Sequence, residues 1–408
     1  MSPRAIHILG GSQTDFALNW HRAGREFDAL VGETIERTLH NARIDPADIG
    51  VVHVGNAFGQ LFTGQGQLGG MPATVLPELW GIPASRHEAA CASGSMAVLA
   101  AMADLESGRY DCALVIGAEL EKTVPGAQAA RYLGAAAWAG HEAHDTDFVW
   151  PTMFAAITDE YDRRYGLDAA HLRAISELNI GNARTNPLAQ TRSWDFTAES
   201  FADDDTANPP VAGRLRRQDC SQMTDGAAAV VLVSDRFLQR HSTIPVERRA
   251  VITGWGHRTV GLSLEAKLRA SADQPYVFPH VRRAMRDALD RARLAEITEV
   301  DGVEVHDCFS MSEYLAIDHL GITAPGESWK AIESGDIGRA GALPVNPGGG
   351  LIGIGHPVGA TGVRMLLDAY KQVTGQAGES QVEGARRFAT CNIGGSATTV
   401  AGFVVEAA

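Results

Sequence analysis

FDALVGETIERTLHNARIDPADIGVVHVGNAF, at residues 27–58, has a counterpart 251 positions later in HVRRAMRDALDRARLAEITEVDGVEVHDCF, at residues 280–309. In both stretches an amphipathic helical segment is followed by a short turn and then by an apolar strand segment. The matching positions are Val52 with Val303, Val54 with Val305, Asn56 with Asp307 and Phe58 with Phe309. A helix followed by a strand, found twice at one constant offset, predicts two similar α/β halves.

Three further apolar stretches are predicted to be buried strands. CALVIGAE at 112–119 and DGAAAVVLVSD at 225–235 are continuous runs typical of strands covered on both faces, and TTVAGFVVE at 398–406 alternates like a closing strand. From Glu121 to about Asp219 the pattern changes to irregular and helical segments, which predicts an insertion over one half. The predicted domains are an N-terminal half at 1–120 that ends at 220–250, a loop domain at 121–219 and a C-terminal half at 251–408.

The composition excludes several classes of protein. With 408 residues, 45% of them hydrophobic and 21% charged, the chain is globular rather than disordered and long enough for two or three packed units. Its net charge of −14 argues against nucleic acid or an anionic membrane as the main partner. No unbroken apolar run is long enough for a membrane span, and the N-terminus lacks the apolar core of a signal peptide.

Five widely spaced cysteines without a CxxC pair argue against a disulfide framework and for a reducing compartment. We therefore expect a cytoplasmic protein. His87 and Cys91, four residues apart, are too few ligands for a metal site, so we expect no metal.

The segment NPGGGLIGIGHPVGATG, residues 346–362, places His356 in a glycine-rich run that we expect to be neither a helix nor a plain strand. Cys91 lies in a turn of small residues before an apolar helical stretch, where a helix N-terminus is expected to lower the pKa of the thiol. Cys391, in CNIGGSATT, is another thiol beside paired glycines. Two thiols and an imidazole in such turns favour acyl-transfer chemistry.

Five motifs, in order, resemble those of the thiolase family over essentially the whole chain. They are EAACASGSMA around Cys91, CSQMTDGAAA at 220–229, HDCFS at 306–310, GHPVGATG around His356 and CNIGGSA around Cys391. HDCFS is most similar to the sterol-carrier-protein-type branch of that family. The resemblance implies the thiolase fold: two duplicated α/β halves in a layered αβαβα arrangement, with an inserted loop domain. It also implies a homodimer or homotetramer and leaves room for an accessory protein.

The resemblance implies a role for each candidate catalytic residue. Cys91 would carry the acyl group, His356 would be its base, and His306 would help to hold one oxyanion, directly or through a water. The other oxyanion would be held by the N–H of Cys91 and by one after Cys391, for which Gly394 is the candidate. A second acid/base must move the proton of the α carbon. Cys391 and Cys308 both remain open for this role, with Cys391 preferred for its glycine-flanked turn.

Substrate binding is expected to use residues from the insertion and its end. Ser221 matches a family serine near the pantetheine chain of coenzyme A, and a turn-forming serine is nearly as good an alternative. Met153 matches a pocket methionine of the family's loop domain, and a packing methionine is the equal alternative. Arg214, Arg216 and Arg217 are the densest basic cluster, and we expect the coenzyme nucleotide there unless the cluster is only a solvated loop. Coenzyme A and acyl-CoA would be substrates, with no cofactor bound permanently.

The leading functional hypothesis is a CoA-dependent thiolase, an acetyl-CoA acyltransferase that condenses acyl-CoA or cleaves 3-oxoacyl-CoA through a cysteine thioester. A second hypothesis is an acyltransferase to an acceptor other than CoA, for which Ile393 leaves room, since many thiolases carry glycine there. A third is a non-catalytic thiolase-like subunit of a complex.

Overall fold

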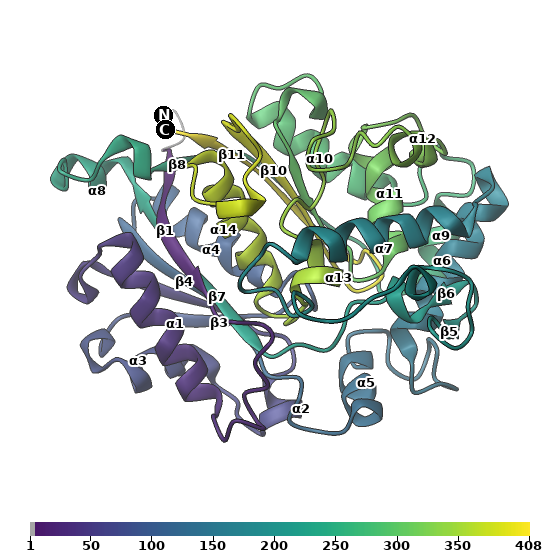
Figure 1. Ribbon diagram of the computed structural model, residues 1–408. Helices are drawn as coiled ribbons and strands as arrows, with labels where there is room; N and C mark the ends of the chain where they lie inside the picture. The colour runs from purple at the N-terminus through teal and green to yellow at the C-terminus, as the bar shows by residue number, and fades with distance from the viewer. Residues whose placement is uncertain (1–4) are drawn as a thin grey trace.

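A twisted sheet runs through the computed structural model, which describes residues 5–408 (Figure 1). Its strands are β1 (Ile6–Gln13), β2 (Val51–Gly55), β3 (Ala84–His87), β4 (Cys112–Glu119), β7 (Gly226–Ser234), β8 (Ala250–Thr259), β9 (Val303–Val305), β10 (Arg387–Gly394) and β11 (Thr399–Ala407). Their order in space is β3-β2-β4-β7-β1-β8-β11-β10-β9. The N-terminal segment considered for a targeting signal begins with residues 1–4, which lie outside the described residues.

The sheet consists of two halves joined at one seam. In the first half, β2 is parallel to β3 and β4, and β7 is antiparallel to β4 and β1. In the second half, β9 is parallel to β10, while β11 is antiparallel to β10 and β8. Only the start of β1 pairs with β8, from Ile6 opposite Ile252 to Ile8 opposite Ala250. The two halves therefore share one sheet but meet along a short ladder.

Helices form three layers, one that packs against strands of both halves and one on the outer face of each half. Helices α4 (Ser93–Glu106) and α14 (Thr361–Val373) contact each other, and α14 also contacts strands of both halves. On the other face, α1 (Phe27–Ala42) covers β1 and β7, and α10 (Pro279–Arg291) covers β8 and β11. Alternate strand residues explain the layering, because Val115 packs in the core around α4 whereas Ile116 packs in the core around α1. The predicted layered α/β fold with two similar halves is confirmed.

The segment between β4 and β7 covers the second half. It holds α5 (Gly126–Gly134), α6 (Val149–Tyr165), α7 (Ala169–Ala183) and a hairpin of β5 (Pro210–Ala212) and β6 (Leu215–Arg216). Helices α6 and α7 pack on α11 (Ser310–Leu320), as Figure 1 shows on the right of the molecule. The remaining helices are α2 (Gly59–Thr63), α3 (Met71–Val75), α8 (Asp235–Arg240), α9 (Leu264–Ala270), α12 (Ser328–Glu333) and α13 (Gly350–Ile354). Within residues 5–408 no helix has the length and apolar character of a membrane span.

Helix α13 corrects one expectation from the sequence. The glycine-rich segment 346–362 was expected to contain no helix, yet α13 lies inside it and α14 begins at its end. The cause is a buried carboxylate, since Asp307 accepts hydrogen bonds from the N–H groups of Leu351 (2.6 Å) and Ile352 (3.2 Å). An acceptor at the first turn of a helix satisfies donors that have no partner within the helix.

Candidate active site

Cys91 lies in a tight turn between β3 and α4. The turn is braced by Ser93, whose hydroxyl accepts from the N–H of Ala89 (2.9 Å) and donates to the carbonyl of Ala90 (2.6 Å). Ala90 has a φ of 50°, a conformation that costs energy for a residue with a Cβ. The structure therefore holds the thiol in a fixed and strained turn at the beginning of α4.

The loop carrying His356 reaches this turn because the elements beneath it present glycine. A Cβ added at Gly94 would stand 2.8 Å from the carbonyl oxygen of Gly359, and one at Gly117 would stand 2.4 Å from it. Both distances are shorter than real contacts, so any side chain at either position would push the loop away. The close approach of two chain segments, rather than flexibility, explains these glycines.

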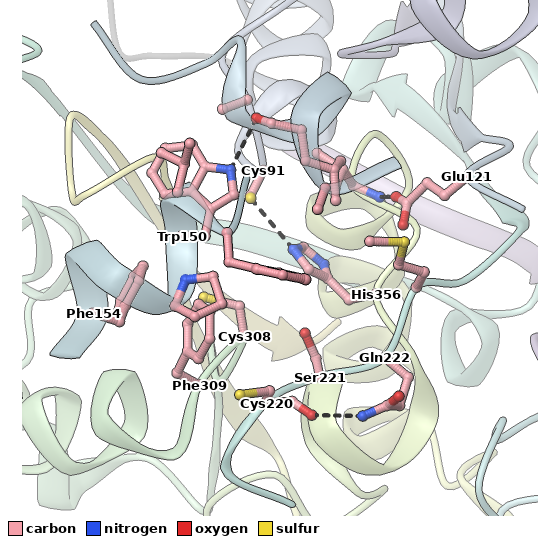
Figure 2. Close-up of a pocket in the computed structure, with 18 of the residues that line it drawn as sticks. Cys91, Glu121, Trp150, Phe154, Cys220, Ser221, Gln222, Cys308, Phe309 and His356 are labelled. Carbon is pink, nitrogen blue, oxygen red and sulfur yellow. Dashed lines mark hydrogen bonds between the residues drawn. The ribbon is translucent and has the colours of Figure 1, made fainter. Parts of the chain in front are cut away.

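The imidazole of His356 is oriented as a base for Cys91. Its Nε2 lies 3.3 Å from the Sγ of Cys91 (Figure 2). Its Nδ1 lies 2.6 Å from the hydroxyl oxygen of Thr361. That hydroxyl donates its own proton to the carbonyl of Pro357 at 3.0 Å. Thr361 must then accept from Nδ1–H, which leaves the lone pair of Nε2 facing the thiol.

Both members of this pair are neutral in the free protein. Burial raises the pKa of the Cys91 thiol to about 12, with the charge of Glu121 as the next cause. Burial and the charge of Arg364 lower the pKa of His356 to about 3. The expected lowering of the thiol pKa by the helix N-terminus is therefore wrong, because desolvation outweighs it. The thiol must lose its proton to His356 as it reacts, rather than stand ready as a thiolate.

His306 lies beside this pair, with its ring centroid 5.1 Å from that of His356. The amide of Asn392 satisfies all its neighbours when its oxygen accepts from His306 Nδ1 (3.0 Å) and its nitrogen donates to Ser95 (2.8 Å) and to the carbonyl of Cys91 (3.2 Å). Burial lowers the pKa of His306 well below its usual value, so the ring is neutral. Its Nε2 lone pair is then available to hold a water or a polar hydrogen.

Two backbone N–H groups interact with the thiol. Those of Gly395 and of Cys91 itself stabilise negative charge on the sulfur. Gly394, the candidate named from the sequence, precedes Gly395 and lines a neighbouring cavity that shares Phe58, Ala90 and Gly395 with the cavity of Cys91. Two N–H groups converging on one point are the arrangement that stabilises an oxyanion.

The two remaining thiols occupy different environments. Cys308 lines the same cavity as Cys91, lies 3.6 Å from the hydroxyl of Ser312, and has its pKa raised well above its usual value by burial and by the proximity of Cys91. Cys391 is fully buried in the apolar core beneath α10 and α11, and burial alone raises its pKa to about 12. Successive side chains of a strand point to opposite faces. Because Asn392 faces the catalytic centre, Cys391 on β10 points away from it.

The cavity that joins these groups has a volume of about 140 Å³. Ser221 lines it, and the N–H of Ser221 donates to the carbonyl of Cys308 at 2.9 Å. Most of the wall is apolar, and Figure 2 shows the aromatic part of it. The larger apolar residues of the wall are Phe58, Leu133, Phe148, Val149, Trp150, Phe154, Met223, Phe309 and Val358. Such a wall suits an acyl or pantetheine chain.

Other residues proposed from the sequence lie elsewhere. Met153 packs in the core of the second half rather than in the cavity wall. Arg214 pairs with Asp162, and Arg216 pairs with Asp203 (3.0 Å) and Asp205 (2.8 Å).

Arg217 is exposed on the same hairpin region. None of the three arginines lines the cavity. The cluster is thus partly neutralised by carboxylates of its own chain.

A metal could be held only by the catalytic groups themselves. Within the described part of the chain, one atom each of Cys91, His306 and His356 lie within 4.8 Å of one another, and thiolate and imidazole are ligand types that zinc accepts. A structural zinc site has four protein ligands, and here three are present. The expectation of no metal stays a prediction.

Sequence reasoning missed Asn392, Thr361 and Glu121. Asn392 directly follows Cys391, and neighbouring strand residues point to opposite faces, but the sequence does not say which of the two faces the site. Thr361 follows His356 at the start of an apolar helical stretch, but no spacing rule links the two. Glu121 entered the sequence analysis only as the start of the predicted insertion, and no motif assigned a role to its carboxyl group.

Comparisons with known proteins identify the family of the chain. The family models "Thiolase, N-terminal domain" and "Thiolase C-terminal domain-like" match residues 6–172 and 264–407. An acetyl-CoA acetyltransferase of Methanothermobacter thermautotrophicus is 32% identical over 400 residues, which are 98% of each chain. Sterol carrier protein 2 of Homo sapiens is 28% identical over 407 residues, 96% of this chain and 70% of that protein.

Solved structures share the fold. An Ltp2-ChsH2(DUF35) aldolase has a TM-score of 0.78 at 21% identity, over 100% of this chain and 99% of that chain. Human mitochondrial 3-ketoacyl-CoA thiolase in complex with CoA has a TM-score of 0.70 at 17% identity, over 99% of this chain and 98% of that chain. With both family models and a relative above 30% identity in agreement, the chain belongs to the thiolase family.

Proposed function

We propose that this protein is a CoA-dependent thiolase, which cleaves a 3-oxoacyl-CoA with coenzyme A or, in reverse, condenses two acyl-CoA molecules. The observation that carries the proposal is the 3.3 Å approach of His356 Nε2 to the Cys91 thiol, with Nδ1 held by Thr361. Relatives named acetyl-CoA acetyltransferase support acyl transfer in general. The specific reaction is our inference from the site.

In the cleavage direction, the sulfur of Cys91 attacks the 3-oxo carbon while its proton passes to His356 Nε2. The N–H groups of Gly395 and Cys91 hold the oxyanion that forms. When the bond between C2 and C3 breaks, its electron pair stays on C2 of the departing acetyl-CoA. Cys308 then donates its thiol proton to C2, a role that suits a thiol whose raised pKa keeps it protonated.

The second half of the reaction restores every group. The thiol of coenzyme A attacks the acyl carbon on Cys91, and its proton returns Cys308 to the thiol form. Cys91 leaves as a thiolate and takes back the proton from His356. His306 contributes through its free Nε2, which holds a water against the oxygen of the second thioester.

The test is acylation followed by thiolysis. The protein incubated with acetyl-CoA should yield a digested peptide that carries an acetyl group on Cys91, and Cys91→Ala should lose both this label and turnover. Free coenzyme A should release acetyl-CoA from acetoacetyl-CoA. Acetyl found only on Cys308 would contradict the assignment. Acetylation of Cys91 without any thiolysis would instead favour transfer to an acceptor other than CoA.

A further inference from the structure

A buried carboxyl in the cavity wall has no part in the chemistry above. Glu121 lies just beyond the end of β4, is 2% exposed, and lines the cavity that contains Cys91 and His356. Figure 2 shows it on the side of His356 away from Trp150. One carboxyl oxygen accepts from the N–H of Val358 at 2.8 Å, and the other accepts from the N–H of Thr224 at 3.3 Å.

These two donors hold the loop of His356 from both sides. Val358 is two residues beyond His356 in sequence. Thr224 accepts the backbone N–H of His356 on its own hydroxyl, at 2.9 Å. One side chain thus connects the end of β4, the segment before β7 and the loop that carries the base. Removing it would free two of the contacts that fix where Nε2 lies relative to the thiol.

The charges around Glu121 oppose its ionisation. Glu119 lies on the same segment, Asp225 approaches from the start of β7, and burial together with these two carboxylates raises the pKa of Glu121 well above its usual value. Lys122 follows in sequence and interacts with both Glu121 and Asp225. Across the cavity, negative charge on Glu121 is one of the causes that raise the pKa of Cys91, second to burial. The other titratable groups of this wall are His356, whose pKa is lowered to about 3, and the thiols of Cys220 and Cys308, whose pKa values burial raises.

We propose that Glu121 is a positioning residue, which fixes the loop of His356 through Val358 and Thr224, and that its ionisation at high pH places a negative charge close to the Cys91 thiol. A carboxylate there would resist the negative charge that the sulfur gains as it attacks. Glu121 therefore sets an upper pH limit on the reactivity of Cys91. The inference deepens the proposed function and rests on it only where acylation is concerned, because the effect on the thiol needs no substrate.

Two neutral variants separate the charge from the hydrogen bonds. Glu121→Gln removes the ionisable proton but keeps an acceptor for Val358, whereas Glu121→Leu removes both. The measurement is the rate at which iodoacetamide alkylates Cys91, read by peptide mass spectrometry across the pH range. Glu36→Gln is the matched control, since Glu36 is exposed on α1, far from the cavity. Thermal unfolding of each variant at neutral pH checks that it is folded, and if the Leu variant does not fold, the Gln variant alone decides the effect of charge.

At alkaline pH both variants should alkylate faster than the wild-type protein, on the order of tenfold, because one buried charge is missing. Near neutral pH the Leu variant should be slower than the Gln variant by about threefold or more, because His356 Nε2 is less well placed. The control should follow the wild-type curve. Coincident pH profiles for the wild-type protein and the variants would overturn the charge effect. Equal rates for the Gln and Leu variants at neutral pH would overturn the positioning role.

This test is independent of the proposed function. If wild-type Cys91 is alkylated as described but never becomes acetylated by acetyl-CoA, the thiolase function fails and the role of Glu121 stands. If Cys91 is acetylated and turns over but the alkylation profiles coincide, the function stands and the role of Glu121 fails.

Discussion

The ends of β2 and β9 occupy equivalent places in the two halves, yet only one of them carries chemistry. The offset of 251 residues that pairs these strands also pairs Gly55 with His306 and Ala57 with Cys308. In the first half, small residues let α4 approach, since a Cβ at Gly55 would stand 2.6 Å from the Cα of Gly94. In the second half, the same positions present an imidazole and a thiol to the cavity. The same positions therefore allow the close packing of α4 in the first half and carry reacting side chains in the second.

Asn56 and Asp307, which lie between these paired positions, both help to hold the loop of His356. Asn56 donates to Glu119 at 2.8 Å, and Glu119 in turn accepts from the N–H of Gly359 at 3.2 Å. Asp307 accepts from the first turn of α13. One side chain therefore braces the segment after His356, and its counterpart braces the segment before it. The pair with the same task in both halves, Asn56 and Asp307, therefore positions the base. The positions that differ between the halves carry the reacting groups His306 and Cys308.

The largest expected effect comes from removing the base that both halves position. His356→Ala should lower kcat/KM for acetoacetyl-CoA thiolysis by about 10² or more, the scale of general-base catalysis. Thr361→Val is the graded control, because it keeps the ring but removes the acceptor for Nδ1, and it should cost less. Near-normal acetylation of Cys91 in His356→Ala would show that another group, with His306 first in line, removes the proton.

The next prediction tests whether Cys308, which follows β9, is the thiol that donates the proton to C2. Cys308→Ala should still become acetylated at Cys91 but lose about 10² in thiolysis, because the proton for C2 has no donor. Cys391→Ala should retain most activity, since that thiol lies in the core on the other face of β10. The opposite pattern would assign the proton transfer to Cys391 and would contradict the conclusion that the segment after β9 carries the reacting thiol.

The sequence predicted the layered fold and named the residues that now meet at the site, including Cys91, His306 and His356. It could do so because the offset repeat is visible in the chain itself and because five motifs, HDCFS with His306 among them, resemble those of the thiolase family. It could not place Cys391 or Asn392, because a strand segment does not say which of its faces meets the ligand. Nor could it show that Arg216 is neutralised, since the partner carboxylates Asp203 and Asp205 are selected by the folded hairpin.

A smaller effect should appear in stability rather than in turnover. Gly55→Ala should destabilise the protein by about 1–3 kcal/mol, because its methyl group would overlap the backbone at Gly94. The measurement is the midpoint of urea unfolding. Gly126→Ala is the control, since a Cβ there meets nothing within 4 Å. Equal midpoints for both variants would show that α4 can shift away from β2, and that the close approach is not required.

The smallest effect concerns the basic cluster outside both strand ends. Arg214 and Arg216 are already paired, so Arg217→Glu should raise KM for acyl-CoA by only about threefold, and added salt should reduce the change. A truncated acyl-pantetheine substrate, which lacks the nucleotide, should not respond. An equal rise with both substrates would assign the arginine to the structure of the hairpin rather than to the coenzyme.

The hydroxyl of Thr361 has a consequence for how protons enter and leave the reaction. Because this hydroxyl donates its hydrogen to the carbonyl of Pro357, it cannot also donate to Nδ1 of His356. Nδ1 therefore keeps its own hydrogen throughout the cycle. The proton that Nε2 gains therefore cannot be passed on through Nδ1 to the solvent. It must be handed back inside the cavity, so the cycle circulates its protons among sulfur, nitrogen and carbon. One proton enters with the thiol of coenzyme A and one leaves on C2 of acetyl-CoA, so we expect turnover not to depend on the concentration of external buffer.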